Sequence, residues 1–368
     1  MSTENRTPIS YAEAGVDTEA GDRAVELMKG ALRATHGPEV VGGAGGFAGL
    51  YDASALREYR RPLLATSTDG VGTKVAIAQA MDVHDTIGHD LVGMVVDDIV
   101  VVGAKPLVMT DYIACGRVVP ERIADIVRGI AEACALTGTA LVGGETAEHP
   151  GLLGPDEYDV AGAATGVVEA DRVLGPERVA EGDVLVALAS SGLHANGYSL
   201  VRRVLEVSGW SLEREVAQLG RTVGEELLEP TRLYTRLCLE LAQDDGLHAL
   251  SHVTGGGLGA NLARVLPAGL VGHVERGSWQ VPAVFDVVRR LGPVEWSDLE
   301  QTLNLGVGMV AVLAPSAAEQ AMRAARAAGI DAWQLGTVER LTDRDEDVVT
   351  GTKGMRGGAV RMHGGYRS

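Results

Sequence analysis

The chain has 368 residues, a length that predicts two or three domains at roughly 150 residues each. Hydrophobic residues make up 46% and charged residues 22%, which is typical of a globular protein with a sizeable core. A formal charge of −18 would repel a nucleic-acid backbone, so nucleic acid is excluded as an expected partner.

The cysteines and the apolar runs indicate the compartment. Cys115, Cys134 and Cys238 form neither a C-x-x-C pair nor a metal-ligand spacing, which is typical of reduced, buried thiols. No apolar run reaches the 18 or so residues of a membrane span, and the N-terminus lacks the apolar core of a signal peptide. The sequence therefore predicts a cytoplasmic protein without a membrane segment.

Hydrophobic spacing outlines the first half of the chain. Residues 1–20 are small and polar, which predicts a mobile arm. The patterns that follow predict a helix over 22–35, a glycine-rich loop over 40–52, a strand over 62–67, a turn over 68–74, a helix over 86–103, a strand over 107–114, a helix beginning at Pro120, and strands over 140–144 and 158–170. We assign these elements to an N-terminal domain over 21–172.

The charged stretch 171–182 contains Gly-Pro and is the best domain boundary. Beyond it the patterns predict a strand over 183–192, a helix beginning at Pro230, a loop over 252–262 that leads into a helix, a helix over 282–291, a strand over 305–313, a helix over 316–328 and a strand over 332–338. We assign them to a C-terminal domain over 173–340, followed by a weakly ordered, charged, Gly-rich tail over 341–368. The predicted fold class is α+β, with two domains of mixed helices and strands.

The segment Thr68-Asp69-Gly70-Val71-Gly72-Thr73-Lys74 follows a predicted strand. It is not a Walker A loop, because Thr68 stands where that motif requires glycine. An ordinary Asp-Gly turn is one interpretation. The other is a nucleotide site, in which Asp69 follows an apolar strand, Gly70 and Gly72 expose backbone N–H groups, and Lys74 reaches a phosphate.

Two further acids stand beside apolar elements. Asp98 lies in a long apolar helix, so we expect it to be buried and to meet a cation, either a basic side chain or a metal ion, while Asp97 faces solvent. Glu145 follows two glycines at the end of a strand. Asp69, Asp98 and Glu145 thus share a pattern of single carboxylates beside apolar elements, and oxygen ligands without a Cys or His cluster suit Mg²⁺ rather than zinc. The spacing of His248 and His252 is interpreted as coincidence.

The glycine cluster over 40–49 contains G-x-G-x-x-A, but no strand precedes it and no helix cleanly follows, which excludes a Rossmann site. A flap over phosphates is one interpretation and a surface loop the other. In the second half, Ser191, His194 and Asn196 lie in a strand-to-helix turn. The loop Thr254-Gly255-Gly256-Gly257 precedes a helix whose N-terminus could seat a phosphate monoester.

These motifs together resemble one family. SYAEAGVD (10–17), PEVVGGAGGFAGLY (38–51), TDGVGTK (68–74), HDTIGHDLVGMVVDDIVVVGAKPL (84–107), LVGGETAEHPG (141–151), SSGLHANGYSLVR (190–202), HVTGGGLGANLARVLP (252–267) and NLGVGMV (304–310) follow the order of phosphoribosylformylglycinamidine cyclo-ligases, also called aminoimidazole ribonucleotide synthetases. The resemblance covers about residues 10–340.

The resemblance implies ATP-dependent closure of formylglycinamidine ribonucleotide to 5-aminoimidazole ribonucleotide through an iminophosphate, in purine biosynthesis. It implies a homodimer in which the N-terminal mixed sheets pair, a C-terminal mixed sheet flanked by helices, and a site between the domains near the dimer seam. By motif, the acids named above would hold Mg²⁺ on ATP.

The remaining implied roles fall into three groups. Gly43, Gly45 and Gly46 would close over the triphosphate; Asp69, Gly70, Gly72, Thr73 and Lys74 would bind it; and Ser191, His194, Asn196 and Thr254, Gly255, Gly256 and Gly257 would contact substrate, with His194 as proton carrier and Lys74 and Asn196 as further catalytic residues. Selenophosphate synthetase, which needs an N-terminal Cys or selenocysteine, is excluded because the first cysteine is Cys115. A nucleotide-binding scaffold would lack the acids.

Overall fold

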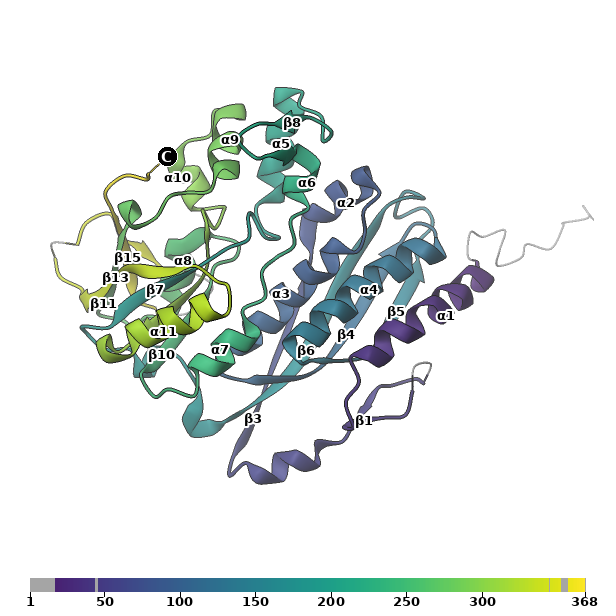
Figure 1. Cartoon of the computed structure of the whole chain (residues 1–368), viewed down its shortest axis with the longest axis horizontal. Coiled ribbons are helices and arrows are strands. Elements are labelled where there is room, and N and C mark those ends of the chain that lie inside the picture. Colours follow the sequence, from purple (N-terminus) through teal and green to yellow (C-terminus); the bar gives the residue numbers. More distant parts are fainter. Residues whose placement is uncertain (1–16, 44–45, 344, 352–356, 368) are drawn as a thin grey trace, which may run out of the picture.

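The first half of the chain builds a four-stranded sheet with helices along one face (Figure 1). The computed structural model describes residues 17–43, 46–343, 345–351 and 357–367. The sheet has the order β3-β6-β4-β5, in which only β4 and β5 run parallel. Its elements are α1 (Thr18–Ala34), β1 (Val40–Val41), β2 (Leu50–Tyr51), β3 (Pro62–Gly70), α2 (Val75–Met81), α3 (Thr86–Val100), β4 (Lys105–Cys115), α4 (Pro120–Thr137), β5 (Ala140–Glu148) and β6 (Tyr158–Glu169).

The helix predicted from Pro120 is confirmed. Pro120 occupies the first turn, where its missing N–H costs nothing, and Gly138 ends the helix with a φ of 73°. Ile123, Ile126 and Ile130 recur at helical spacing and are buried against the sheet and α3. Local sequence was sufficient here because the cap residues and the apolar stripe agree.

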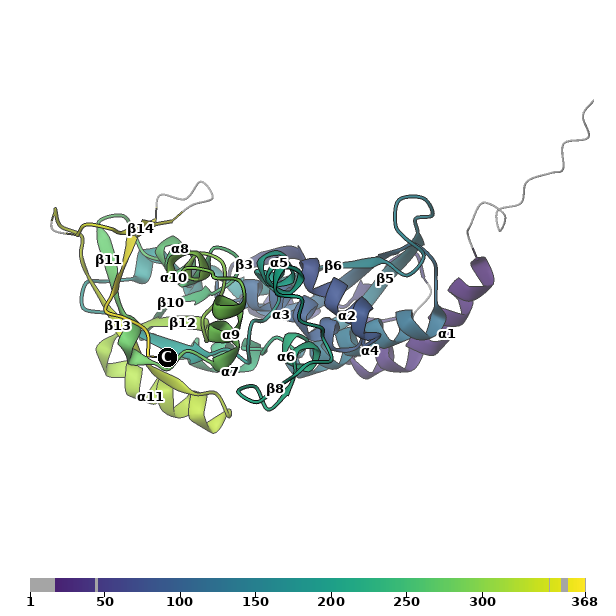
Figure 2. The same cartoon turned by 90° about the horizontal axis from the view of Figure 1, so that it is seen from above.

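The other face of this sheet is open. The strands alternate, so that buried Met109, Asp111 and Ile113 of β4 lie on the helix-covered face, while Thr110 and Tyr112 lie on the opposite face and are exposed. Figure 2 shows the same one-sided arrangement from above. An antiparallel-rich sheet tolerates one solvated face, but Leu64 on β3 is also exposed there, at 64%.

The second half builds a seven-stranded mixed sheet, in the order β10-β12-β7-β13-β11-β15-β14, with helices against it. One of its interior strands, β7, is apolar throughout, as a strand covered on both faces requires. The elements are β7 (Val184–Ala189), α5 (Tyr198–Ser208), β8 (Glu215–Val216), β9 (Arg221–Thr222), α6 (Val223–Leu227), α7 (Thr235–Leu241), β10 (Leu247–His252), α8 (Gly257–Arg264), β11 (Leu270–Glu275), α9 (Ala283–Leu291), α10 (Trp296–Glu300), β12 (Val307–Leu313), α11 (Pro315–Ala327), β13 (Ala332–Arg340), β14 (Val349–Thr350) and β15 (Ala359–His363).

The prediction of a weakly ordered tail from Leu341 is wrong for its last part. β15 pairs in parallel with β11, and Ala359 and Val360 are buried in the C-terminal sheet. Two short apolar strands were hidden in the sequence by the surrounding glycines and charges. The predicted arm over 1–20 lies mostly outside the described residues, but 18–20 belong to α1, which begins four residues before the prediction.

The helix predicted from Pro230 begins later, at Thr235. Residues 231–234 are non-helical because their donors are used elsewhere: the backbone N–H groups of Thr231 and Tyr234 bond to carboxylates of α3 in the other domain. The last strand of the first sheet ends at Glu169 and β7 begins at Val184, and the boundary near residue 172 stays a prediction. Among the helices of the described ranges, none is both long and apolar enough to cross a bilayer.

Candidate functional site

Asp97 and Asp98 sit side by side on α3, and the sequence predicted their burial in the wrong order. Asp97 is fully buried, where its Oδ2 accepts a hydrogen bond from Tyr234 N at 3.0 Å and its Oδ1 accepts one from Thr235 Oγ1 at 2.6 Å. Burial raises the pKa of Asp97 despite these bonds. The side chain of Asp98 is 42% exposed. The error arose because the donors for Asp97 lie about 140 residues further along the chain.

Asp98 does meet a potential cation, and it is His252 at the end of β10. The His252 Nδ1 lies 2.9 Å from Asp98 Oδ1, and its Nε2 is buried without a partner among the described residues. Burial alone would lower the pKa of His252, but the hydrogen bond to Asp98 and the charges of Asp98, Asp97 and Asp69 raise it. Sequence reasoning dismissed this histidine as coincidental spacing, and its position at the start of the HVTGGG loop was the available signal.

Asp69 and Glu145 do not converge within one chain. Asp69 is paired across neighbouring strands with Gly162, Gly162 with Asp111, and Asp111 with Gly144. Directly paired residues point to the same face of a sheet, so Asp69 lies on the helix-covered face with Asp111. Its strand, β3, is one edge of that sheet. Glu145 is one residue further, on the open face of the opposite edge strand, β5. The two carboxylates are separated by three strand spacings, about 14 Å, and by the sheet itself.

The predicted flap belongs with Glu145 rather than with Asp69. Gly43 and Gly46 lie in the connection between β1 and β2, and Gly45 lies outside the described residues. The end of this connection packs on β5, since a Cβ on Gly49 would lie 2.5 Å from the carbonyl oxygen of Val142. The predicted nucleotide site is therefore divided between the two edges of the N-terminal sheet.

These positions test the fit of a magnesium ion. Among the residues that the structure describes, no three His, Cys, Asp or Glu side chains are arranged to hold a metal ion. Magnesium commonly takes only one or two protein carboxylates and completes its shell with phosphate oxygens and water. Asp98 and Asp69 meet that smaller requirement, because both are exposed. The negative charges of both also raise the pKa of His252, so both carboxylates lie near that ring.

The structure does not place Lys74 where it could make the phosphate contact that the sequence predicted. It is fully buried, and its Nζ donates to Asp90 Oδ1 at 2.8 Å, to the Glu229 carbonyl at 2.7 Å and to the His194 carbonyl at 3.2 Å. An ammonium group has three donors, so none remains for a ligand. Burial lowers the pKa of Lys74, and the charge and hydrogen bond of Asp90 oppose that effect. The lysine ties the two domains together beneath the site.

His194 is held in a strained, buried position. Its φ is 62°, a left-handed conformation that non-glycine residues rarely adopt. Its Nε2 accepts a hydrogen bond from Ser191 N at 3.2 Å, so the proton is on Nδ1, which is buried without a partner among the described residues. Burial, with the charges of His252 and Lys74, keeps the pKa of His194 well below its usual value. The ring is therefore neutral near pH 7.

The space around His194 explains one glycine in the sequence. A Cβ on Gly308 would lie 1.9 Å from Tyr234 Oη and 2.6 Å from His194 Cε1. Gly308, the second glycine of NLGVGMV, therefore leaves room for the rings of Tyr234 and His194. Ser191, which was grouped with His194 as a substrate residue, donates its Oγ–H to the Pro230 carbonyl at 2.6 Å.

Two loops of the C-terminal domain meet at Asn196. Its Nδ2 lies 3.2 Å from Met94 Sδ on α3, and a Cβ on Gly255 would lie 3.3 Å from its Oδ1. Nearby, Thr73 Oγ1 lies 3.2 Å from Ser199 Oγ, which brings the TDGVGTK turn beside the same loops. Segments predicted separately for nucleotide and substrate therefore share one boundary between the domains.

The Thr254–Gly257 loop is braced from within and from behind. Asn261 Nδ2 donates to the carbonyls of Thr254 at 3.2 Å and Gly257 at 2.8 Å. Gly257 has a φ of 71°, and a Cβ there would lie 1.7 Å from the Glu300 carbonyl oxygen, so only glycine fits.

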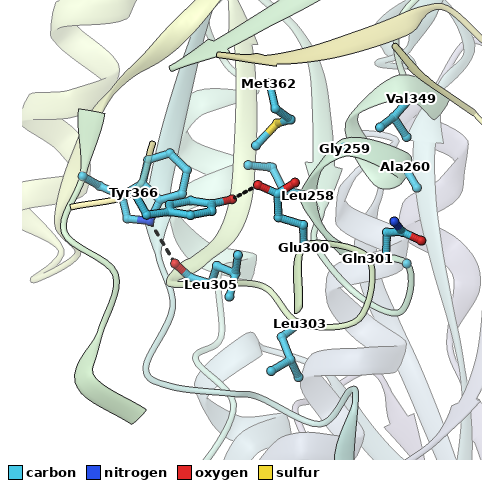
Figure 3. A pocket seen from close by; sticks show the side chains of 12 residues that line it. Leu258, Gly259, Ala260, Glu300, Gln301, Leu303, Leu305, Val349, Met362 and Tyr366 are labelled. Carbon is cyan, nitrogen blue, oxygen red and sulfur yellow. Dashed lines mark hydrogen bonds between the residues drawn. The ribbon is translucent and has the colours of Figure 1, made fainter. Parts of the chain in front are cut away.

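Behind this loop, the C-terminal segment closes a cavity of about 60 Å³ (Figure 3). Tyr366 Oη donates to Glu300 Oε1 at 2.7 Å, and Met362 and Val349 form the facing wall. Trp279 Nε1 donates to the Leu305 carbonyl at 2.9 Å at the base. The C-terminal segment therefore packs against the Thr254–Gly257 loop and the start of α8.

Comparison with known proteins identifies the family. The description AIR synthase related protein, N-terminal domain, matches residues 51–168, and the corresponding C-terminal domain matches residues 180–348. A phosphoribosylformylglycinamidine cyclo-ligase from Sorangium cellulosum (strain So ce56) is 50% identical over 338 residues, which cover 91% of this chain and 97% of that protein. The chain belongs to the phosphoribosylformylglycinamidine cyclo-ligase family. The resemblance inferred from the motifs is confirmed, and the protein is an enzyme of the ligase class.

A cyclo-ligase from Anaeromyxobacter sp. (strain Fw109-5) is 49% identical over 332 residues, which cover 90% of this chain and 96% of that protein. Solved structures share the cyclo-ligase fold at lower identity. Thiamine-monophosphate kinase from Stenotrophomonas maltophilia K279a has a TM-score of 0.62 at 18% identity, covering 91% of this chain and 95% of that one. Hydrogenase maturation protein HypE in complex with ATP has a TM-score of 0.62 at 18% identity, covering 95% and 93%.

Proposed function

We propose that this chain closes the imidazole ring of 5-aminoimidazole ribonucleotide from formylglycinamidine ribonucleotide, at the expense of ATP, in the cytoplasm. ATP transfers its γ-phosphoryl group to the formamide oxygen and leaves as ADP. A nitrogen of the same substrate then attacks the carbon, the C–O bond breaks, and phosphate departs. The observation that carries this proposal is the near-complete coverage of curated cyclo-ligases at about half identity.

The boundary between the domains supports such a reaction. Ring closure within one bound molecule needs positioning more than a nucleophile from the protein. Asn196, the Thr254–Gly257 loop and the TDGVGTK turn supply amide, hydroxyl and backbone N–H groups there. We assign Asn196 and the loop to substrate. His194, neutral and already bonded through Nε2, would have to shift before it could carry a proton.

ATP would be bound with Mg²⁺ at Asp69 and Asp98. HypE is named as a complex with ATP, and a T. maritima PurL with a TM-score of 0.52 is named as a complex with AMPPCP. The metal would neutralise phosphate charge during transfer. His252 holds Asp98 Oδ1, which fixes the carboxylate and leaves Oδ2 to face the ligand. We assign Lys74 to positioning the His194 loop rather than to the phosphates.

Glu145 and the flap would enter the same site only from a second subunit. The open face of the N-terminal sheet carries Glu145, Tyr112 and Leu64, and pairing two such faces in a homodimer would bring the β5 edge of one chain toward the β3 edge of the other. We therefore propose that the metal and nucleotide site is completed across the dimer.

Substrate-dependent ADP release tests the reaction. We expect ADP to appear only when formylglycinamidine ribonucleotide is added, with one 5-aminoimidazole ribonucleotide formed for each ADP. ADP release without ring product would contradict the proposal.

Two acid substitutions test the shared site. We expect Asp98→Asn and Glu145→Gln each to lower turnover at least 100-fold with the fold retained, whereas Glu319→Gln, at an exposed acid on α11, leaves it unchanged. A 1:1 mixture of the two inactive variants, allowed to exchange subunits, should regain roughly one quarter of wild-type activity, because half the dimers are mixed and each has one intact site. No recovery, with subunit exchange demonstrated, would reject the shared site.

A further inference from the structure

A cavity of about 440 Å³ lies between the domains, on another side of α3. Its size falls within the range typical of small-molecule sites and far exceeds the cavity behind Tyr366. Its walls come from α3 and α4 of one domain and from the 229–237 segment and residues 328–330 of the other. Its lining includes the titratable or hydroxyl side chains of His89, Ser191, Glu229, Arg232 and Arg236.

The charge of this cavity is opposite to that of the chain. Arg232 is half-buried and has no hydrogen bond or ion pair with any residue that the structure describes. Arg236 donates one bond to the Ala135 carbonyl at 3.2 Å and has no carboxylate partner within the described ranges. The Glu229 carboxylate is already bound to Arg221 at 2.6 Å. In a protein of net charge −18, the half-buried guanidinium of Arg232, with the exposed guanidinium of Arg236 lining the same cavity, favours an anionic ligand.

The remaining walls limit the kind of anion. The hydroxyls of Thr231, Thr235 and Ser191 are engaged by Asp90, Asp97 and the Pro230 carbonyl, so they offer little to a sugar or polyol. Thr137 also lines the cavity, but its hydroxyl is bonded to the Cys134 carbonyl at 3.0 Å, and the other lining side chains are apolar: Leu136, Pro230, Leu233, Leu237, Ala328 and Ile330. A guanidinium fork binds a phosphate in a bidentate manner, and an apolar wall accepts a flat ring.

The cavity is separate from the reaction site yet connected to it. His89 and Asp98 are nine residues apart on α3, which at 3.6 residues per turn places them on opposite faces. Ser191 lines the cavity and donates its N–H to His194 Nε2, 3.2 Å away. A ligand that touched both walls would also fix the relative position of the domains.

We propose that this interdomain cavity is a binding site for a phosphate monoester attached to a flat ring, such as a nucleoside monophosphate, and that its occupancy acts on His194 through Ser191. The binding is independent of the proposed reaction; only the effect on turnover rests on it.

Calorimetric titration of the full chain, without added metal, tests the binding. The probes are adenosine 5′-monophosphate, formylglycinamidine ribonucleotide, ribose 5-phosphate and adenosine. We expect one site for a ring-bearing monoester, weaker binding of ribose 5-phosphate, and none of adenosine. Arg232→Gln should weaken the monoester at least 10-fold, and Arg236→Gln serves as a second variant should the first unfold. Arg203→Gln, at an exposed arginine on α5, should leave affinity unchanged.

The outcomes separate the sources of the ligand and the two proposals. Binding of adenosine monophosphate that persists in Asp98→Asn and under saturating AMPPCP identifies a second nucleotide site. Binding of formylglycinamidine ribonucleotide alone, lost in Arg232→Gln, would overturn the flat-ring specificity, because that ribonucleotide carries no base ring, and would assign the cavity to the phosphate of the substrate. Absence of monoester binding at millimolar concentration, or binding unaffected by both arginine variants, overturns the inference whether or not the chain closes the ring.

Discussion

Asp111 is an acid whose ionised form the fold disfavours. It is 8% exposed on the helix-covered face of β4, where its carboxyl packs over Gly144. Burial raises the pKa of Asp111 to about 7. A carboxyl with a raised pKa binds its proton more tightly in the folded state. The stability linked to this proton is therefore full below pH 4 and lost as the pH rises from about 4 to 7.

Asp111→Asn should remove the loss of folding stability that accompanies the rise in pH. We expect the variant to be more stable than wild type at pH 8, by on the order of 4 kcal/mol, and the difference to shrink toward zero at pH 4. Thermal or urea unfolding at both pH values measures it, with Asp22→Asn on the exposed face of α1 as control. An equal effect at both pH values would mean that Asp111 does not titrate.

Among the elements, α3 holds the two domains together. Asp90 and Asp97 are seven residues apart, two turns along one face, and both accept hydrogen bonds from the 231–235 segment. Lys74 completes the contact by bonding to Asp90 and to the carbonyls of His194 and Glu229. The conformation of the His194 loop thus depends on a lysine in the other domain.

Lys74→Met should be strongly destabilising, because it leaves the Asp90 charge buried beside one partner fewer. Removing one member of a buried ion pair costs about 3–5 kcal/mol. We expect the double variant Lys74→Met/Asp90→Asn to be more stable than Lys74→Met alone, because the buried charge is removed. Its turnover should stay low, because the His194 carbonyl still lacks the hydrogen bond from Lys74. Lys29→Met, at an exposed pair on α1, is the control. Full turnover in the double variant would show that Lys74 does not position the loop.

The segment that follows β15 is the second part of the chain with a measurable role. Tyr366 packs against Trp279 and Trp296, with ring centroids 5.4 and 4.9 Å apart, and bonds to Glu300. We expect Tyr366→Ala to cost about 2–3 kcal/mol in unfolding free energy and Tyr366→Phe about 1 kcal/mol, because phenylalanine keeps the packing and loses only the hydrogen bond. Similar unfolding midpoints for wild type and Tyr366→Ala would indicate a tail that contributes nothing.

For the whole molecule, the open face of the N-terminal sheet is the surface through which we propose that the chain self-associates. It carries Leu64 at 64% exposure and Tyr112 at 42%, among small side chains that allow close approach. Charge placed at the centre of an apolar interface is costly to bury.

Leu64→Arg should therefore convert the proposed dimer to a monomer and, if the site is shared, remove activity with it. Light scattering after size exclusion measures the mass, and Leu152→Arg, at an 82% exposed leucine in the β5–β6 connection, is the control. A dimer that survives Leu64→Arg would place the interface elsewhere.

Much of the architecture could be predicted from the sequence because its signals are local. The helix from Pro120 has its own first-turn proline, apolar stripe and terminal glycine, and the strands over 140–144 and 158–170 are bounded by glycines or polar turns. The family resemblance implied a site between the domains, and the structure brings the segments near Thr73, Asn196 and Thr254 to that boundary.

By itself, then, the sequence determined the family, the two mixed domains and the loops that meet between them. Only the tertiary structure decided that Asp97 and not Asp98 is buried, that Lys74 is fully bonded, that His252 pairs with Asp98, and that Glu145 lies across the sheet from Asp69. Each of these depends on partners from other elements or on strand order. Residue spacing specifies periodicity within an element, but it carries no information about which distant donor will face a given side chain.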